Sequence, residues 1–294
     1  MFVEALDQVD QFTRAIHFIC RYHGSAEIIP QTATMFFVNE EGCAVTCRHV
    51  ADNLIYSDQF YTRYLEFRKE FRYFEKAATA ALERKRLEEK YGLKPESLIR
   101  IKSSFPDSVS GDFRLIIHRH PVYDLAIVKF EGYREVRYRS FARFLKDESR
   151  VRPGRTLCRL GYPFPEFTNY QFNRDTDDIE WSQSGKISTP AFPIDGIITR
   201  QVADMNGIFG IEMSTPGLKG QSGGPLFDTQ GIIYGMQSAT QHLHLGFDQV
   251  NREVISEGLR KRVSNYPFLN VGRCVHVRII KDFLRTKKIK FYEA

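Results

Sequence analysis

The stretch Gly220-Gln221-Ser222-Gly223-Gly224-Pro225 decides how the rest of the chain is interpreted. A serine flanked by glycines on a tight turn can direct two backbone N–H groups, those of Gly220 and Ser222, at one point in space. Paired donors of this kind stabilise the oxyanion that forms during acyl transfer. Glycine permits the unusual dihedral angles of such a turn and lets a substrate backbone approach closely. The stretch therefore predicts either a plain turn or a nucleophilic serine with an oxyanion hole.

A serine hydroxyl is a weak nucleophile unless an imidazole accepts its proton and a carboxylate orients that imidazole. The candidate base is His49, which directly follows a predicted β-hairpin over residues 33–47. The candidate acid is Asp124, which opens the apolar strand predicted over 125–130. His49, Asp124 and Ser222 are therefore the candidate catalytic residues, and Gly220 and Ser222 are the candidate oxyanion donors.

Four motifs, in this order, resemble those of the chymotrypsin-like (trypsin-fold) serine peptidases, in particular the bacterial trypsin-like branch that also contains the HtrA proteases. The family patterns are T-x-x-H-V at 46–50, D-L-A-[IV]-[VL]-K at 124–129, G-x-S-G-G-P-L at 220–226 and V-x-G-[IM]-x-S at 232–238. The resemblance covers roughly residues 30–250. It implies a mainly β fold of two antiparallel six-stranded β-barrels. It also implies a serine endopeptidase that acts on protein substrates through an acyl-enzyme intermediate and needs no cofactor.

The chain departs from the family pattern in three places. Gln221 stands where the vertebrate digestive enzymes carry an aspartate that pairs with a freed N-terminus, so activation by N-terminal cleavage is not expected. The family's G-[ST]-G-F appears as Thr32-Ala33-Thr34-Met35-Phe36. His49 and Asp124 are 75 residues apart because a foreign segment lies between them.

We expect an N-terminal helix in residues 1–29, because apolar residues recur at helical spacing over 4–19. The first barrel is predicted over 30–135, with a helical insertion at 56–97, and the second over 150–250. A basic helical extension is predicted over 251–294. No PDZ-like domain is expected after the barrels.

The insertion has neither Pro nor Gly between Tyr56 and Tyr91, which predicts one helix of about 30 residues or a helix with a kinked second part, and Gly92 predicts its end. Its aromatic residues recur at steps of three and four, which gives the helix an apolar face. This face either packs on the chain's own barrel, or docks a regulatory protein partner or covers the active site. The residues of this face are Phe60, Tyr64, Phe67, Phe71 and Phe74.

The formal net charge is +6, and the excess of basic residues lies in 56–102 and 276–294. Mixed signs along the predicted helix disfavour nucleic acid as a partner. No run of 18 apolar residues predicts a membrane span, and the N-terminus lacks a basic-then-apolar leader pattern, so we expect a cytoplasmic protein. The five cysteines are odd in number and lack zinc-ligand spacing, which favours free thiols and no metal.

The resemblance places the primary specificity pocket between the segment before the nucleophile and the strand after it. The predicted substrate-binding residues are Pro216, Gly217, Ser238, Ala239 and Thr240. Pro216 stands where trypsin carries its acid, and small side chains predict a shallow pocket that prefers a medium-sized apolar residue. An acidic preference through His242 or His244 is the second alternative, and a basic preference through Asp248 is the third.

A serine endopeptidase regulated by a partner or by a stress or defence trigger is the leading functional prediction. The alternative is a catalytically silent trypsin-fold module that acts through its helical insertion. The complete set of His49, Asp124 and Ser222 favours the enzyme.

Overall fold

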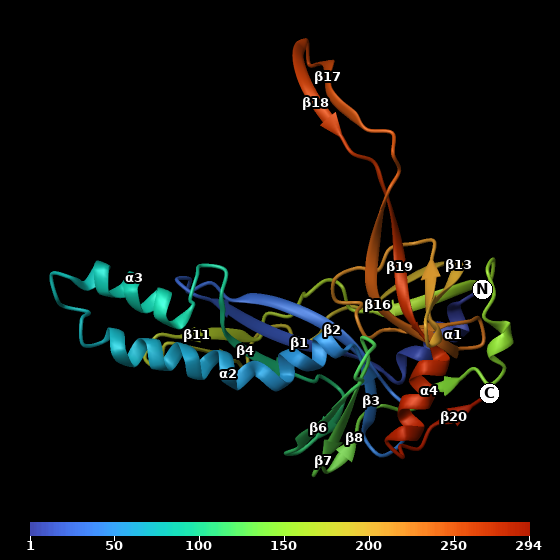
Figure 1. Ribbon diagram of the computed structural model, residues 1–294. Coiled ribbons are helices and arrows are strands. Elements are labelled where there is room, and N and C mark those ends of the chain that lie inside the picture. Colours follow the sequence, from blue (N-terminus) through green and yellow to red (C-terminus); the bar gives the residue numbers. More distant parts are fainter.

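Two β-sheets form the body of the protein in the computed structural model, which describes all residues 1–294 (Figure 1). The first sheet has six antiparallel strands, and its edge strands do not pair, so it is an open half-barrel. Six antiparallel strands of the second sheet close into a ring through the pairing of β15 with β16. Two short strands extend this sheet in parallel. The prediction of a mainly β, trypsin-like fold is confirmed, with the first barrel open rather than closed.

In spatial order the first sheet consists of β4 (Leu98–Ser104), β1 (Thr13–Tyr22), β2 (Ile29–Phe37), β3 (Cys43–Thr46), β7 (Ala126–Glu131) and β6 (Arg114–Arg119). The second consists of β15 (Pro225–Phe227), β10 (Thr156–Gly161), β13 (Phe192–Asp204), β14 (Gly207–Met213), β19 (Phe268–His276), β16 (Ile232–His244), β9 (Arg143–Phe144) and β20 (Tyr292–Glu293). Three small two-stranded sheets pair β5 (Val109–Ser110) with β8 (Glu135–Val136), β11 (Tyr170–Asn173) with β12 (Asp178–Trp181), and β17 (Gln249–Ser256) with β18 (Leu259–Asn265). The helices are α1 (Val3–Asp10), α2 (Arg48–Phe71), α3 (Ala80–Tyr91), the 3₁₀ helix η1 (Glu148–Arg150) and α4 (Val277–Thr286).

The N-terminal segment corrects the predicted helix over 4–19. The helix α1 ends at Asp10, and Thr13–Tyr22 is a strand in the middle of the first sheet. Ile16 and Ile19 fall at helical spacing only because β1 is buried on both faces, so its apolar residues form a nearly continuous run. Thr, Ile and aromatic side chains favour the strand.

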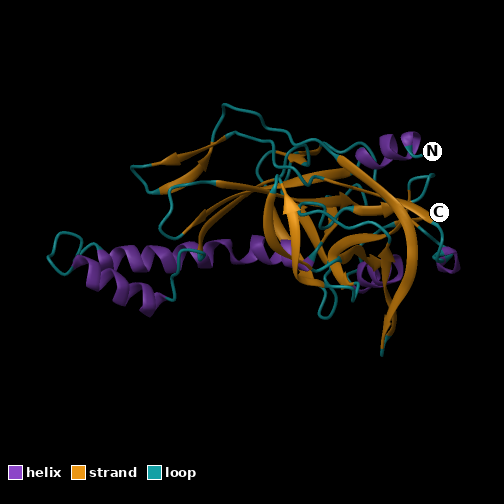
Figure 2. Cartoon of the chain, turned by 90° about the horizontal axis from the view of Figure 1, so that it is seen from above, coloured by secondary structure: helices purple, strands orange, loops and turns teal.

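The insertion forms two helices where a single long or kinked helix was predicted. The helix α2 begins at Arg48, so the predicted insertion continues the helix that carries His49. The chain turns at 72–79, and α3 folds back beside α2 (Figure 1). Gly92 ends α3 in the left-handed conformation at a φ of 60°, as predicted. The pair, called here the helical hairpin, extends from one side of the β body, while both termini lie at the other (Figure 2).

The aromatic face of the helical hairpin is buried by the chain itself. Tyr64 and Phe67 form a small core with Leu87 of α3 and Ile99 of β4, and Phe71 packs at its edge. Phe60 packs against the main core, which spans both sheets. Charged groups surround this contact, and Lys90 pairs with Glu70 at 2.6 Å. The face therefore serves as a packing surface between the hairpin and the first sheet.

The predicted C-terminal helical extension over 251–294 is wrong for its first half. β17, β18 and β19 occupy 249–276, and β19 is a wall of the ring between β14 and β16, so the second barrel runs past residue 250. Only α4 is helical. The distal ends of β16 and β19, together with β17 and β18, form a long projecting arm (Figure 1). No helix in the structure has the length and apolar character needed to cross a membrane.

Thr34 on β2 joins the two sheets next to the Ser222 loop. Its N–H donates to the carbonyl of Ser222 at 2.9 Å, and its hydroxyl donates to the carbonyl of Gly220 at 2.7 Å. The same oxygen accepts from the N–H of Tyr162 at 3.2 Å, and the carbonyl of Thr34 accepts from the hydroxyl of Thr46 at 2.7 Å. Thr34 is fully buried, so each of these groups depends on it for its hydrogen bond.

We predict that Phe67→Ala lowers the free energy of unfolding by about 3 kcal/mol or more, because it empties the centre of the contact between the helical hairpin and the first sheet. Tyr73→Ala, at a side chain that is 78% exposed, is the matched control and should change stability little. Urea denaturation followed by circular dichroism measures both. Equal stability of the two variants would mean that the aromatic face is not a packing surface.

We predict that Thr34→Val, which keeps the side-chain shape, costs about 1–3 kcal/mol, because the carbonyl of Gly220 and the N–H of Tyr162 lose a buried partner. Thr62→Val on the exposed surface of α2 removes a hydroxyl that bonds only its own helix and is the control. Thermal denaturation of both variants tests this. A Thr34→Val protein as stable as the control variant would show that the bridge does not hold the sheets.

Candidate active site

The Ser222 loop connects β14 to β15 and depends on two glycines. Gly220 and Gly223 adopt φ angles of +91° and +89°, which side chains rarely allow. A Cβ on Gly220 would lie 2.4 Å from the carbonyl oxygen of Tyr162. A Cβ on Gly223 would lie 2.0 Å from the carbonyl oxygen of Thr34. The loop is therefore pressed against both sheets, and Ser222 is held between them.

The predicted oxyanion donors have N–H groups that make no internal hydrogen bond. Within the loop, the N–H of Gln221 bonds Leu218, that of Gly223 bonds Gln237 and that of Gly224 bonds Gln221. The N–H groups of Gly220 and Ser222 are absent from this network. They remain available to a ligand oxygen.

The side chain of Gln221 is fully buried and holds the loop without a charge. Its carbonyl oxygen accepts from the N–H of Leu218 at 3.1 Å, and its amide donates to the carbonyl of Phe192 at 3.1 Å. An aspartate here would need a cation, whereas the amide is satisfied by backbone groups. The terminal residue Met1 is exposed.

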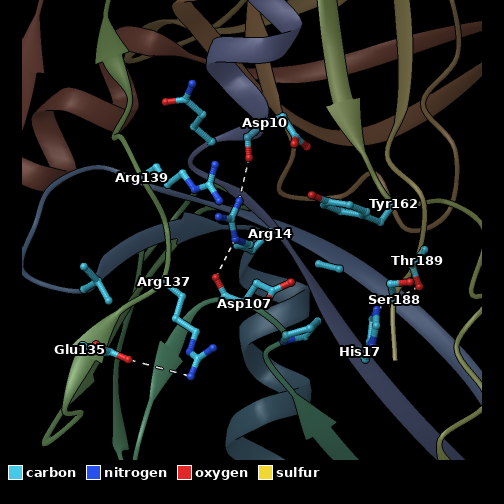
Figure 3. A pocket seen from close by; sticks show the side chains of 14 residues that line it. Asp10, Arg14, His17, Asp107, Glu135, Arg137, Arg139, Tyr162, Ser188 and Thr189 are labelled. Atoms are coloured by element: carbon cyan, nitrogen blue, oxygen red, sulfur yellow. Dashed lines mark hydrogen bonds and ion pairs between the residues drawn. The ribbon is translucent and has the colours of Figure 1, made fainter. Parts of the chain in front are cut away.

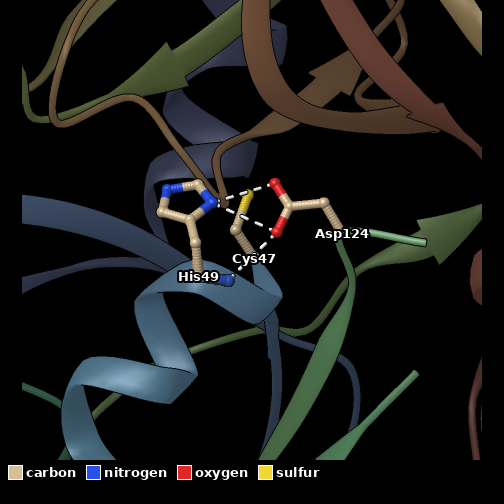
Figure 4. A group of neighbouring side chains, drawn as sticks. All are labelled: Cys47, His49 and Asp124. Atoms are coloured by element: carbon tan, nitrogen blue, oxygen red, sulfur yellow. Dashed lines mark hydrogen bonds and ion pairs between the residues drawn. The ribbon is translucent and has the colours of Figure 1, made fainter. Parts of the chain in front are cut away.

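His49 and Asp124 come together because β3 pairs with β7. Thr46 lies opposite Ala126, so the residues just beyond these two strand ends are neighbours. His49 Nδ1 lies 2.9 Å from Asp124 Oδ2 and 3.1 Å from Oδ1 (Figure 4). The backbone N–H of His49 also donates to Oδ1 at 3.0 Å. Two hydrogen bonds to one carboxylate fix the ring and the first turn of α2 together.

Two opposing effects act on the carboxyl of Asp124. Burial disfavours its charged form, but the hydrogen bonds from the ring and the backbone of His49 outweigh this and hold the pKa of Asp124 below its ordinary value. The group is therefore ionised at neutral pH.

Ser222 lies where two clefts meet. One cleft, of roughly 470 Å³, is lined by His49, Gly220 and Ser222 and by residues of β2 and of 163–165. The other, of roughly 430 Å³, is lined by Ser222 and by the segments before and after it. Lys219 also borders both clefts. No hydrogen bond joins the Ser222 hydroxyl to the His49 ring in this structure, and such contacts often tighten only when a substrate is bound.

All five predicted substrate-binding residues line the second cleft. They are Pro216, Gly217, Ser238, Ala239 and Thr240. The hydroxyl of Thr240 donates to the carbonyl of Gly217 at 2.6 Å and so ties the two walls together. His242 also lines the cleft, whereas His244 and Asp248 pair with each other at 2.6 Å on the projecting arm.

Cys47 lies beside the pair, and Sγ of Cys47, Nδ1 of His49 and a carboxylate oxygen of Asp124 lie within 4.8 Å of one another (Figure 4). This is the only cluster of metal-ligand atoms in the chain. Burial, and after it the charge of Asp124, raise the pKa of the Cys47 thiol well above its ordinary value. A thiolate ligand is therefore disfavoured, and the arrangement suits a hydrogen-bonded His–Asp pair better than a metal site.

Three residues near the site were absent from the predictions. Thr34 belongs to the segment that departs from the family pattern. Its hydroxyl donates to the carbonyl of Gly220, a hydrogen bond that a small residue without a hydroxyl could not make. Arg159 and Gln237 form a buried hydrogen bond of 2.7 Å behind the second cleft. The sequence contained an indication that Arg159 is unusual, because it is a charged residue within the apolar strand 156–161.

A larger groove of roughly 690 Å³ lies away from this site (Figure 3). Among its charged side chains, Arg14 donates to the backbone carbonyls of Asp10 and Asp107. His17 at its edge is stacked on Phe167 and hydrogen-bonded to Thr189. Burial lowers the pKa of His17 to about 4. The His17 ring meets the Thr189 hydroxyl, but both residues are buried and no carboxylate orients the ring, so this groove is not a candidate active site.

No curated protein sequence matches the chain significantly. Similar solved structures include the HtrA-type protease AlgW with a tripeptide, at 14% identity and a TM-score of 0.48. They also include its serine-to-alanine variant with a tripeptide, at 13% identity and a TM-score of 0.49. In both cases the match covers 97% of this chain and 63% of the other, so the chain spans less than two thirds of those proteins.

The family described as "Trypsin-like peptidase domain" matches residues 33–236. This range includes the half-barrel from β2 onward, the helical hairpin, and the second sheet up to the first half of β16. It contains His49, Asp124 and Ser222 in that order. The chain belongs to the trypsin-like peptidase domain family.

Proposed function

We propose that the protein is a serine endopeptidase in which Ser222 is the nucleophile, His49 the general base and Asp124 the orienting acid. The observation that carries this proposal is the His49–Asp124 pair, held by two hydrogen bonds at the cleft that Ser222 lines. A carboxylate bonded to Nδ1 leaves Nε2 of the ring as the proton acceptor.

In the proposed reaction, Oγ of Ser222 attacks the carbonyl carbon of the peptide bond while Nε2 of His49 takes the hydroxyl proton. The carbonyl oxygen becomes an oxyanion and is stabilised by the N–H groups of Gly220 and Ser222, which have no internal partner. His49 then gives its proton to the leaving amine. A water molecule, deprotonated by His49, hydrolyses the acyl-enzyme and frees Ser222.

The silent interaction module is less well supported, because the aromatic face of the helical hairpin is used internally. A regulatory protein that binds 56–97 would have to contact the charged outer surface of the hairpin. Since α2 carries His49 in its first turn, we propose that such a partner would act through the position of that helix. The compartment that we propose is the cytoplasm, which suits five buried free cysteines.

We predict that Ser222→Ala and Asp124→Asn each lower kcat on peptide substrates by about 10⁴-fold, the first by removing the nucleophile and the second by misorienting His49. Arg155→Met, at a residue that lines neither cleft, is the control and should retain activity. Cleavage of fluorogenic peptides and labelling by a fluorophosphonate measure the effect. Full activity of Ser222→Ala on any substrate cleaved by the wild type would refute the assignment.

Hydrolysis should also slow as the pH is lowered through the range in which histidine takes up a proton, because only a neutral ring can act as the base. Iodoacetamide should leave activity intact, since Cys47 is fully buried and its thiol stays protonated. Inactivation by iodoacetamide combined with resistance to fluorophosphonates would instead indicate a thiol mechanism.

A further inference from the structure

Arg159 carries a charge inside the second sheet without a charged partner. Its side chain is fully buried. One guanidinium nitrogen donates to Oε1 of Gln237 at 2.7 Å, and the other donates to the carbonyl of Thr215 at 3.0 Å and to its hydroxyl at 2.5 Å. All of these acceptors are neutral, and Nε has no partner at all. The exposed Asp195 acts on the guanidinium electrostatically but makes no ion pair with it.

A buried cation with neutral partners is costly for a fold. Lysine or histidine could lose its proton in such a place, but arginine stays charged in proteins. Burial lowers the pKa of Arg159, but its ordinary value is far above neutrality. The positive charge therefore persists and favours any anion that comes near it.

The surrounding backbone makes room for this charge. A Cβ on Gly272 of β19 would lie 2.3 Å from Nη1 of Arg159. A Cβ on Gly217 would lie 2.2 Å from Nε2 of Gln237. Glycines at both positions thus accommodate the guanidinium and the amide in front of it. Cys274 completes the group by donating its S–H to Gln237 Oε1 at 3.5 Å.

Gln237 separates Arg159 from the cleft beside Ser222. Gln237 lines that cleft, and Thr215 directly precedes its wall residue Pro216. One hydrogen of the Gln237 amide is used by the carbonyl of Ala239 at 2.7 Å, and the other makes no hydrogen bond within the protein, although only 2% of Gln237 is exposed. The guanidinium behind the amide polarises it toward donating that hydrogen.

The cleft contains no negative charge of its own. Its lining includes Lys219 and His242, and no aspartate or glutamate. Nδ1 of the His242 ring is hydrogen-bonded to Oδ1 of Asn270 at 2.6 Å. Nε2 is therefore the ring nitrogen that can bond another partner. Lys219 is the one side chain of the lining with a permanent charge, and that charge is positive. The field in the cleft therefore complements an anionic side chain.

We propose that this cleft is the primary specificity pocket and selects substrates with a glutamate side chain on the acyl side of the cleaved bond, with Arg159 as a positioning residue acting through Gln237. The proposal rests on the proposed peptidase function. Glutamate is favoured over aspartate because the fixed charge lies behind the pocket wall, where the longer side chain approaches it more closely. This differs from the medium-sized apolar preference expected from the small side chains of Ala239 and Thr240.

The test compares two fluorogenic peptides that differ only in glutamate or glutamine before the cleaved bond, so that charge changes while shape does not. We expect kcat/KM of the wild type to be at least about tenfold higher for glutamate, since a site built around a charged partner rejects its neutral analogue. Arg159→Met should lower this ratio at least severalfold, toward one. Arg155→Met removes the same charge from the residue preceding β10 and should keep the wild-type ratio. A purely structural Arg159 would change melting temperature but leave the ratio intact.

Gln237→Glu keeps the test decisive if Arg159→Met does not fold. Its carboxylate would pair with the guanidinium inside the protein, so the ratio should fall below one while the buried charge is neutralised. A wild-type ratio in Gln237→Glu or in folded Arg159→Met would overturn the proposal. So would a loss of the ratio in Lys219→Met but not in Arg159→Met.

Fluorophosphonate labelling of Ser222 separates this proposal from the function on which it rests. Labelling and peptide cleavage with a glutamate-to-glutamine ratio of about one would overturn the specificity alone. Neither labelling nor cleavage of any peptide would overturn the peptidase and the specificity together.

Discussion

The hydrogen bonds of Thr34 hold the candidate site together. One buried residue of the first sheet bonds the carbonyls of Gly220 and Ser222, and its hydroxyl also receives the N–H of Tyr162 from the second. His49 and Asp124 lie just beyond strand ends of the first sheet, and Ser222 lies in a loop of the second, so their alignment depends on how firmly the two sheets are joined at this point. The glycines of the loop let its backbone come close enough for these bonds to form.

The parts of the site that lie within short motifs could be predicted from the sequence. The motifs around His49, Asp124 and Ser222 each occupy one turn or strand end, where local residue types limit the backbone. The pairing of β3 with β7 then brings the first two residues together. Gly92 was also predictable, because a left-handed helix end favours glycine.

Other features depend on contacts between distant segments, which periodicity does not encode. β1 was predicted to be helical because a strand buried on both faces shows no alternation. β19 was predicted to be part of a helical tail. In the structure it is the sixth strand of the ring, and the chain reaches this strand only after the projecting arm. Arg159 gained significance only when the structure placed it behind Gln237 with neutral partners.

The order of the strands along the chain also determines when the site can form during synthesis. A nascent chain that has reached residue 244 already contains His49, Asp124 and Ser222, yet β14 and β16 still lack the strand that lies between them. That strand, β19, is made only after the arm, and it carries Gly272, which faces the guanidinium of Arg159. An unfinished ring has open edges and an incomplete pocket wall. A growing chain on the ribosome therefore holds all three candidate catalytic residues before it holds the last strand of the ring, so the candidate site can be completed only late in synthesis.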